Sequence, residues 1–163
     1  MNTKQLFATV PVALLLGAAG AAAGEKGTYE SVYAWTKTYQ TVEQGHGRSA
    51  TAGYAPGTRT ITKGNGLFPE GSVLIAECVI YVEQGPEGIN LKAPCVYTDV
   101  ESGDKIFSVH VRISDQLAEG GGREKLTGGT GKYEGLTGEC TYHVTYLPGD
   151  IGVQQNRCEW EVK

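Results

Sequence analysis

Gly128-Gly129-Thr130-Gly131-Lys132-Tyr133-Glu134-Gly135-Leu136-Thr137-Gly138 is the stretch that decides how this sequence folds. Five glycines fall within eleven residues, and an alternating apolar and polar pattern follows directly over 139–147. Glycine adopts backbone angles that other residues avoid, and it lets chain segments approach closely. The stretch therefore predicts a tight, crowded path that leads into a β-strand.

The same stretch does not have the pattern of a phosphate-binding loop. Leu126 stands where such a loop has its first glycine, and Tyr133 follows Lys132 where a Ser or Thr is required. The sequence also has no dinucleotide-binding glycine motif, no nucleophile elbow and no H-E-x-x-H zinc motif. We therefore interpret the glycine run as a structural element.

Short alternating runs separated by Gly, Pro and Asp clusters fill the rest of the chain, a pattern typical of β-strands. The expected strands are 28–41, 48–54, 58–63, 72–83, 90–100, 105–114, 123–127, 139–147 and 154–162. The expected turns are 44–47, 55–57, 64–66, 85–88, 101–104, 119–122 and 148–152. A helix is conceivable only around 114–119. Eight or nine strands at this spacing predict an all-β sandwich or a closed barrel.

The N-terminus has the features of a secretory signal peptide. Lys4 supplies a positive charge, 6–16 is apolar, and Ala21-Ala22-Ala23 has the small residues of a cleavage site. We expect 1–23 to be removed and 24–163 to form one domain, secreted or periplasmic and without a membrane anchor. The full chain carries a formal net charge of −4 and has no basic block, which disfavours nucleic-acid binding.

Four cysteines are expected to form two disulfides in an exported protein. Cys78 and Cys95 lie symmetrically about the turn signal at 84–88, and Cys140 and Cys158 lie symmetrically about Gly149. Residues that face each other across a hairpin have this spacing, so we predict Cys78–Cys95 and Cys140–Cys158. Neither these spacings nor the scattered histidines match a metal site.

Period-two alternation assigns the faces of several strands. The inward face is expected to carry Cys140, Tyr142, Val144, Tyr146, Cys158, Trp160, Val162, Tyr29, Tyr33, Trp35, Tyr39, Cys95, Tyr97 and Asp99. In 105–114 we expect the apolar residues Phe107, Val109, Val111 and Ile113 inside. His110, Arg112 and His143 are then expected outside, and His46 is expected in an exposed turn.

The glycine stretch with Glu139-Cys140-Thr141-Tyr142 resembles the Gly-Gly-Thr-Gly-Lys-Tyr/Phe segment of allene oxide cyclase-like and dirigent-like barrels. The stretches 95–99 and 102–107 resemble small exported bacterial members of that group. The resemblance implies a single antiparallel eight-stranded β-barrel of the allene oxide cyclase-like or calycin-like type. It also implies an apolar cavity that orients a reactive substrate without a cofactor, and homotrimers among plant relatives.

These observations lead to a first functional hypothesis, an exported barrel that binds an aromatic or lipid-like small molecule. It would act as a cofactor-free cyclase, isomerase or lyase, or as a stereochemical guide. Tyr33, Trp35, Tyr142, Tyr146 and Trp160 would bind the substrate. Asp99 would be the catalytic acid or base, its pKa raised by burial, and the Tyr97 hydroxyl would assist an oxyanion.

Each of these assignments has an alternative. The aromatic rings can simply fill a small barrel, and Asp99 lies where a turn favours a locally hydrogen-bonded Asp. The polar outer faces favour a monomer over a homotrimer. A second function, from another class, is a non-catalytic periplasmic binding or inhibitor protein.

Overall fold

Nine β-strands and one short 3-10 turn make up most of residues 24–114 and 119–163, the parts of the chain that the computed structural model describes. The strands are β1 (Lys26–Thr36), β2 (Thr38–Gly45), β3 (Arg48–Gly64), β4 (Val73–Gly85), β5 (Gly88–Asp99), β6 (Lys105–Ser114), β7 (Glu119–Gly129), β8 (Leu136–Leu147) and β9 (Ile151–Val162), with the turn η1 (Gly131–Tyr133) before β8. The expected signal peptide and residues 115–118 of the expected helix lie outside the described residues.

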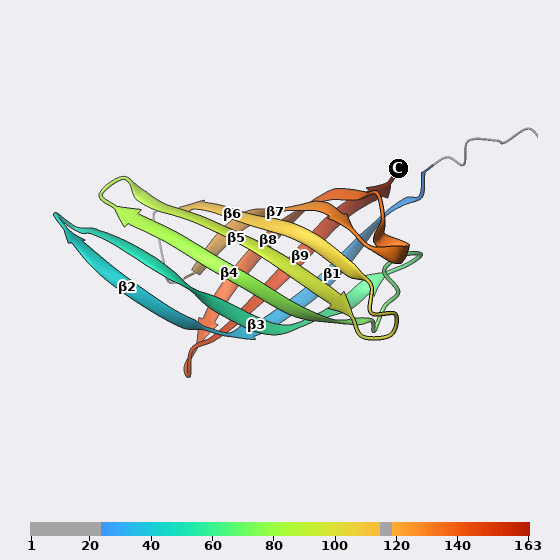
Figure 1. Ribbon diagram of the computed structural model, residues 1–163, viewed down its shortest axis with the longest axis horizontal. Coiled ribbons are helices and arrows are strands. Elements are labelled where there is room, and N and C mark those ends of the chain that lie inside the picture. The colour runs from blue at the N-terminus through green and yellow to red at the C-terminus, as the bar shows by residue number, and fades with distance from the viewer. Residues whose placement is uncertain (1–23, 115–118) are drawn as a thin grey trace, which may run out of the picture.

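Eight of the strands close into an antiparallel barrel (Figure 1). The order is β1-β9-β8-β7-β6-β5-β4-β3, and β3 pairs with β1 to complete the circuit. The ninth strand, β2, pairs only with β3 in the described structure. The prediction of an all-β barrel with eight or nine strands is therefore confirmed.

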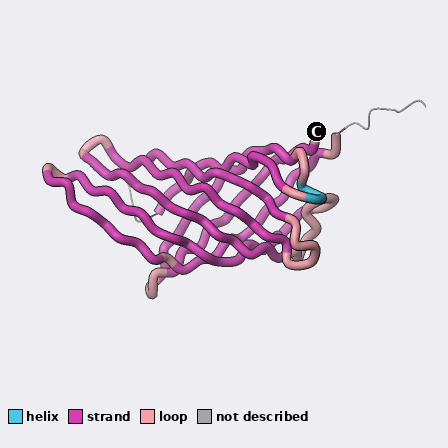
Figure 2. Tube along the Cα trace, in the orientation of Figure 1, coloured by secondary structure: helices cyan, strands magenta, loops and turns pink. Residues whose placement is uncertain are grey.

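One end of the barrel is extended by two hairpins. β2 continues β1 in the same register on β3, because Trp35 pairs with Gly57 and Thr38 pairs with Tyr54. Between them, the Lys37 backbone N–H donates to the Asp150 carbonyl at 3.0 Å, and there the chain leaves β9. The β2–β3 and β4–β5 hairpins thus project beyond the closed circuit (Figures 1 and 2). We call this end the mouth and the opposite one the closed end.

Two expected turns are wrong. Residues 55–57 lie inside β3, where Pro56 is opposite the break between β1 and β2 and its missing N–H interrupts no ladder. Residues 119–122 lie inside β7, and the Tyr142 ring occupies the space that a side chain at Gly122 would need. Both segments have turn-forming composition, but neighbouring strands hold them extended.

The glycine run forms the corner between β7 and β8, as predicted. The Thr130 backbone N–H donates to the Lys105 carbonyl at 2.8 Å, so the corner is tied to β6. At Gly129 a Cβ atom would collide with that carbonyl, and Gly131 has φ +54° with the Asp104 carboxylate where its side chain would point. Close approach and a left-handed backbone both require glycine here.

Aromatic residues fill the closed end. Phe68, from the loop after β3, stacks on Tyr29 with ring centroids 4.2 Å apart. It also contacts Trp160 at 5.4 Å and Tyr133 at 5.6 Å. This aromatic group belongs to a core that continues along the inside of the barrel.

Both disulfides have the predicted pairing, Cys78–Cys95 between β4 and β5 and Cys140–Cys158 between β8 and β9. They are consistent with a secreted protein. In the part of the chain that is described, no helix is long and apolar enough to cross a membrane.

The inward faces predicted for β1, β5, β8 and β9 are confirmed, whereas the prediction for β6 is reversed. His110 and Arg112 are buried, with 4% and 3% of their surface exposed, while Phe107 and Val111 are 37% and 41% exposed. The predicted alternation in β6 is correct, but the polar face of the strand lies inside the barrel. There His110 contacts the buried Tyr97 and Glu124.

Candidate functional site

The centre of the barrel holds a buried network of charged and polar side chains. Arg59 of β3 donates two hydrogen bonds to Glu124 of β7, at 3.0 and 2.8 Å, and a third to the Tyr97 hydroxyl of β5, at 2.7 Å. His110 Nε2 of β6 lies 3.0 Å from Glu124 Oε1 and 3.0 Å from the Tyr97 oxygen. The consecutive strands β5, β6 and β7 and the more distant strand β3 therefore meet in one polar cluster.

The charges in this network fix its protonation. Burial alone would raise the pKa of Glu124, but Arg59 and His110 hold that pKa well below its usual range. Burial raises the pKa of Tyr97 far above its usual range, despite the opposing charge of Arg59. At neutral pH Glu124 is a carboxylate and Tyr97 keeps its proton, and both groups are bound to Arg59, so neither is a proton donor that awaits a substrate.

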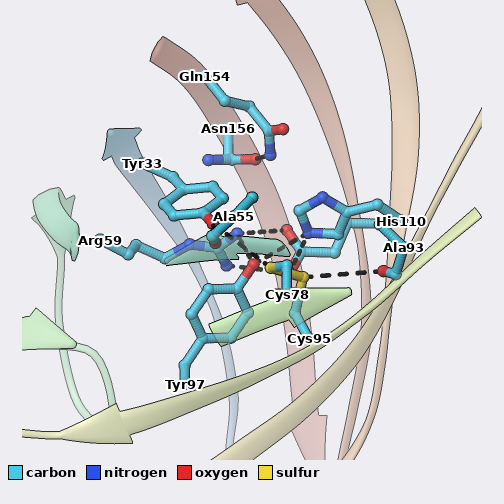
Figure 3. The surroundings of a disulfide bond; sticks show 11 residues. Tyr33, Ala55, Arg59, Cys78, Ala93, Cys95, Tyr97, His110, Gln154 and Asn156 are labelled. Carbon is cyan, nitrogen blue, oxygen red and sulfur yellow. Dashed lines mark hydrogen bonds and ion pairs between the residues drawn. A yellow bond between two sulfur atoms is a disulfide. The ribbon is translucent and has the colours of Figure 1, made fainter. Parts of the chain in front are cut away.

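The Cys78–Cys95 disulfide lies beside this network (Figure 3). The Tyr33 hydroxyl donates to the Ala55 carbonyl at 2.6 Å and lies 3.5 Å from the Cys78 sulfur. The Tyr33 ring meets the Tyr97 ring edge-on at 6.0 Å. The expected residues Tyr33 and Tyr97 are thus together, and both hydroxyls have protein partners.

The barrel interior above the network is nearly full. Only about 30 Å³ remains open there, which is room for about one water molecule. Its walls include Tyr33, Trp35, His110, Arg112, Tyr142 and Tyr146. Four of the five residues expected to bind substrate therefore lie together. Their main role here is to fill the barrel, which agrees with the alternative interpretation of the aromatic interior.

The largest hollow that continues this interior lies at the mouth. It has a volume of about 610 Å³ and is bounded by the inner faces of the two projecting hairpins. Its walls are Lys37, Tyr39, Thr41, Glu43, Ser49, Thr51, Ile80, Val82, Gln84, Ile89, Leu91, Arg112 and Tyr146. Such a volume is in the range of small-molecule sites, and apolar walls with a few polar groups are typical of them.

Aromatic rings and a cation line one wall of this mouth pocket. The Lys37 ammonium lies 5.0 Å from the Tyr146 ring centre and 5.6 Å from that of Tyr39. Trp35, which borders the small open space of the barrel interior, meets the Tyr146 ring edge-on at 6.4 Å. Burial raises the pKa of the Tyr39 and Tyr146 hydroxyls, which remain hydrogen-bond donors at neutral pH. The wall offers flat apolar faces with hydroxyl groups at their edges.

Asp99 lies at the closed end, away from the mouth. Its Oδ1 accepts from the backbone N–H groups of Glu101 and Ser102, and its Oδ2 accepts from the Tyr133 hydroxyl and from Lys132, both at 2.8 Å. Burial opposes ionisation, but these donors hold the pKa of Asp99 well below its usual range. The expected rise in pKa is therefore wrong, and the geometry is that of a turn-stabilising Asp. The catalytic roles expected for Asp99 and Tyr97 stay predictions.

Trp160 also lies at the closed end, against Phe68 and beside Gly27. It does not line the mouth pocket, so it is separated from the other aromatic residues expected to bind substrate. A second hollow of about 610 Å³ lies over β1, β8 and β9, where exposed charges such as Arg123 and Glu139 pair with each other at 3.5 Å. That surface lacks the aromatic wall of the mouth.

One group of metal-ligand types lies close together, Glu124, Cys140 and Cys158, within 4.8 Å of one another. The two sulfurs are bonded to each other, and the carboxylate is bound to Arg59. A metal would need free thiolates, so these residues serve the structure.

Sequence reasoning missed Arg59 and Glu124. Glu124 lies between Arg123 and Lys125, a run that reads as an exposed face. One signal was present: Cys140 was assigned to the interior, and Glu124 is its partner on the neighbouring strand. An inward carboxylate at Glu124 then requires an inward cation, which Arg59 supplies.

No protein-family model and no curated protein sequence matches the chain. A solved structure, that of the pterocarpan synthase dirigent protein GePTS1, superposes with a TM-score of 0.54 and 13% identity over 96% of this chain and 100% of that one. This chain has a dirigent-like barrel fold. The fold agrees with the resemblance carried by the glycine corner.

Proposed function

We propose that this dirigent-like barrel binds a small aromatic or phenolic compound in the mouth pocket and holds it in one orientation. The observation that carries the proposal is the pocket of about 610 Å³, which joins the aromatic wall of Tyr39 and Tyr146 to the apolar inner faces of β4 and β5. A planar ring can stack on these tyrosines, while their hydroxyls bond to its polar substituents. The superposable structure is that of a pterocarpan synthase dirigent protein, and this likeness supports the same ligand class.

The chemistry that the pocket can offer is orientation rather than acid–base catalysis. The buried carboxylates Glu124 and Asp99 have lowered pKa values and protein partners. The tyrosines around the pocket have raised pKa values and stay protonated. Holding a reactive compound in one geometry needs only shape and hydrogen-bond donors. We therefore favour a stereochemical guide over a cyclase, isomerase or lyase, and no cofactor is required.

A second candidate function is a non-catalytic binding or inhibitor protein. The observation that favours it is the nearly filled barrel interior, with about 30 Å³ open above the central network. In that case the mouth would hold a ligand without changing its reactions. The two functions share the binding step and differ in whether coupling products change.

The two tryptophans provide a test with its own control. Trp35 lies near the pocket and Trp160 lies at the closed end. In Trp160→Phe, which retains Trp35, titration with the bicyclic phenol 2-naphthol should change the tryptophan fluorescence and saturate. In Trp35→Phe, which retains Trp160, the signal should barely respond. Equal responses from both variants would contradict binding at the mouth.

Substitutions in the wall make the same test from the protein side. Leu91→Arg narrows the pocket and adds a charge, so it should weaken 2-naphthol binding by about tenfold or more. Val100→Ala, at an exposed position of the closed end, is the matched control and should bind normally. Unchanged binding in Leu91→Arg would refute the site. Chiral analysis of phenol coupling products, with and without protein, then separates a guide from a passive binder.

A further inference from the structure

Apolar side chains gather on the outer face of one side of the barrel. Of the eleven large apolar residues that are most exposed in the described structure, seven lie on the outside of β3, β4 and β6. They are Tyr54, Val73, Ile75, Val79, Tyr81, Phe107 and Val111. Scattered exposed apolar residues are normal, but a continuous patch indicates a contact surface.

The strand register shows that this patch is continuous. Tyr54 pairs with Val79 across β3 and β4. Pro94 of β5 pairs with Val109 of β6, and Val96 pairs with Phe107 in the next row. Four adjacent strands thus present neighbouring apolar side chains, which we call the outer apolar face. With strands about 4.8 Å apart and about 3.3 Å per residue, it measures roughly 19 by 23 Å.

Two opposite charges interrupt the outer apolar face. Glu77 of β4 pairs with Val96, and Lys92 of β5 lies four residues before Val96, so the two charges are roughly 13 Å apart. They cannot pair within one chain. Glu77 accepts a hydrogen bond from the Tyr54 hydroxyl at 2.7 Å, and Lys92 makes no ion pair with the described residues.

This arrangement is self-complementary. A two-fold axis that lies in the plane between two such faces, passes midway between the charges and is perpendicular to the line that joins them places Glu77 of each copy opposite Lys92 of the other. Two-fold interfaces use the same patch on both subunits and match each residue with a different one. An unrelated partner would not need its charges to be spaced in this way, and the net negative charge of the chain disfavours an anionic membrane.

We propose that two copies of this chain dock face to face through the outer apolar face, with reciprocal Glu77–Lys92 ion pairs. The sheets then pack as in a β-sandwich, about 10 Å apart. The outer apolar face forms the centre of the interface, and the polar ends of β4, β5 and β6 form its rim. With this rim, the buried area approaches the value of about 800 Å² per subunit that is typical of a standard interface. This dimer is independent of whether the mouth pocket binds a ligand.

Molar mass in solution provides the test. Sedimentation equilibrium of the purified protein over a range of concentrations should give twice the monomer mass. Val79→Glu places a charge at the centre of the face and should give monomers. Because Val79 is 58% exposed, the variant should fold, which circular dichroism and thermal unfolding can verify. Monomers of the unchanged protein at every concentration, a trimer, or a dimer that persists in Val79→Glu would each overturn the proposal.

Charge reversal tests the two-fold geometry itself. Glu77→Lys and Lys92→Glu should each weaken the dimer about tenfold or more, because each variant opposes like charges. The double reversal restores opposite charges and should restore dimerisation. Glu139→Lys, on the exposed face of β8, is the matched control and should leave the mass unchanged. A double variant as weak as the single variants would refute the reciprocal pairing.

Discussion

The barrel body and the mouth hairpins each contain a bidentate Arg–Glu pair, in opposite surroundings. Arg59 and Glu124 are 1% and 0% exposed at the barrel centre, with hydrogen bonds of 3.0 and 2.8 Å. Arg48 and Glu87 are 52% and 65% exposed between the hairpin tips, with bonds of 2.8 and 3.2 Å. The Arg–Glu geometry is nearly the same, and the two pairs differ in their access to water and in the Tyr97 and His110 contacts of the central pair.

This difference separates structural from adaptable parts of the molecule. In the body, every strand has two neighbours, and the central charges Arg59 and Glu124 are paired with each other. At the mouth, β2 has a neighbour on one side in the described structure, and its charges remain in solvent. We therefore expect the body to determine stability and the mouth to tolerate change.

The largest effect is expected from breaking the central pair. Arg59→Met should lower the free energy of unfolding by about 3–5 kcal/mol, because Glu124 is left as a buried charge without its arginine partner. Arg59→Met with Glu124→Met should recover much of that loss, since two apolar side chains need no partner. Urea unfolding measures both variants. A double variant that is less stable than the single one would contradict this account.

Removing either disulfide should have a somewhat smaller effect. The two bridges close loops with sequence separations of 17 and 18 residues, so loss of each should cost about 3 kcal/mol through the unfolded chain. Cys140→Ala with Cys158→Ala and Cys78→Ala with Cys95→Ala should therefore unfold at similar urea concentrations. A much larger loss for one pair would mean that its native contacts, rather than the loop, dominate.

Asp99→Asn tests the closed end and depends on pH. At neutral pH we expect a loss of about 1–3 kcal/mol, because Lys132 loses its charged partner. The folded pKa of Asp99 is lowered, so its contribution is present above about pH 4 and disappears as the pH falls further. The gap between the unchanged protein and Asp99→Asn should shrink on acidification. Urea unfolding from neutral pH down to about pH 2 measures it.

Glu101→Gln, an exposed neighbour in the same turn, serves as the control for Asp99 and should show no such gap. The same Asp99→Asn protein also addresses the catalytic prediction. If product chirality or turnover is lost while the protein remains folded, Asp99 participates in chemistry despite its turn geometry. Retained activity would leave it with a structural role.

The smallest effect is expected at the exposed pair. Arg48→Met should change the free energy of unfolding by less than about 1 kcal/mol, because solvent screens exposed ion pairs. This is the matched counterpart of Arg59→Met, with the same substitution in an equivalent geometry. Equal losses at Arg48 and Arg59 in urea unfolding would remove the distinction between mouth and body.

Local signals in the sequence predicted much of the fold. The glycine corner, both cysteine pairs and the inward faces of β1, β8 and β9 follow from spacing within one hairpin or one strand. The turn predicted at 55–57 is wrong because Pro56 lies opposite the β1–β2 break, where a proline can remain inside a strand. Such information comes from a strand neighbour and cannot be taken from the local residues.

The site was less predictable because it depends on long-range contacts. The alternation in β6 is compatible with either face inside the barrel. Hydrophobicity favoured the face with Phe107 and Val111, whereas the face with His110 and Arg112 is buried. The decision rests on Arg59, Tyr97 and Glu124, which meet His110 from three other strands. The mouth pocket depends likewise on where β1 ends and the chain leaves β9, at Lys37, a position with no distinctive composition.

The seam between β1 and β9 has a consequence for the timing of folding. β1 meets β3 after one local hairpin, whereas its pairing with β9 joins Lys26 to Glu161 across the described chain. Contacts with such a separation form slowly. Until β9 pairs, the sheet is open and the strands β1 and β8 are edge strands, each unpaired on one side. Such edges make a partly folded chain prone to aggregation. The chance of escaping aggregation while the chain folds should therefore depend on how quickly the β1–β9 ladder forms, a property that equilibrium stability does not measure.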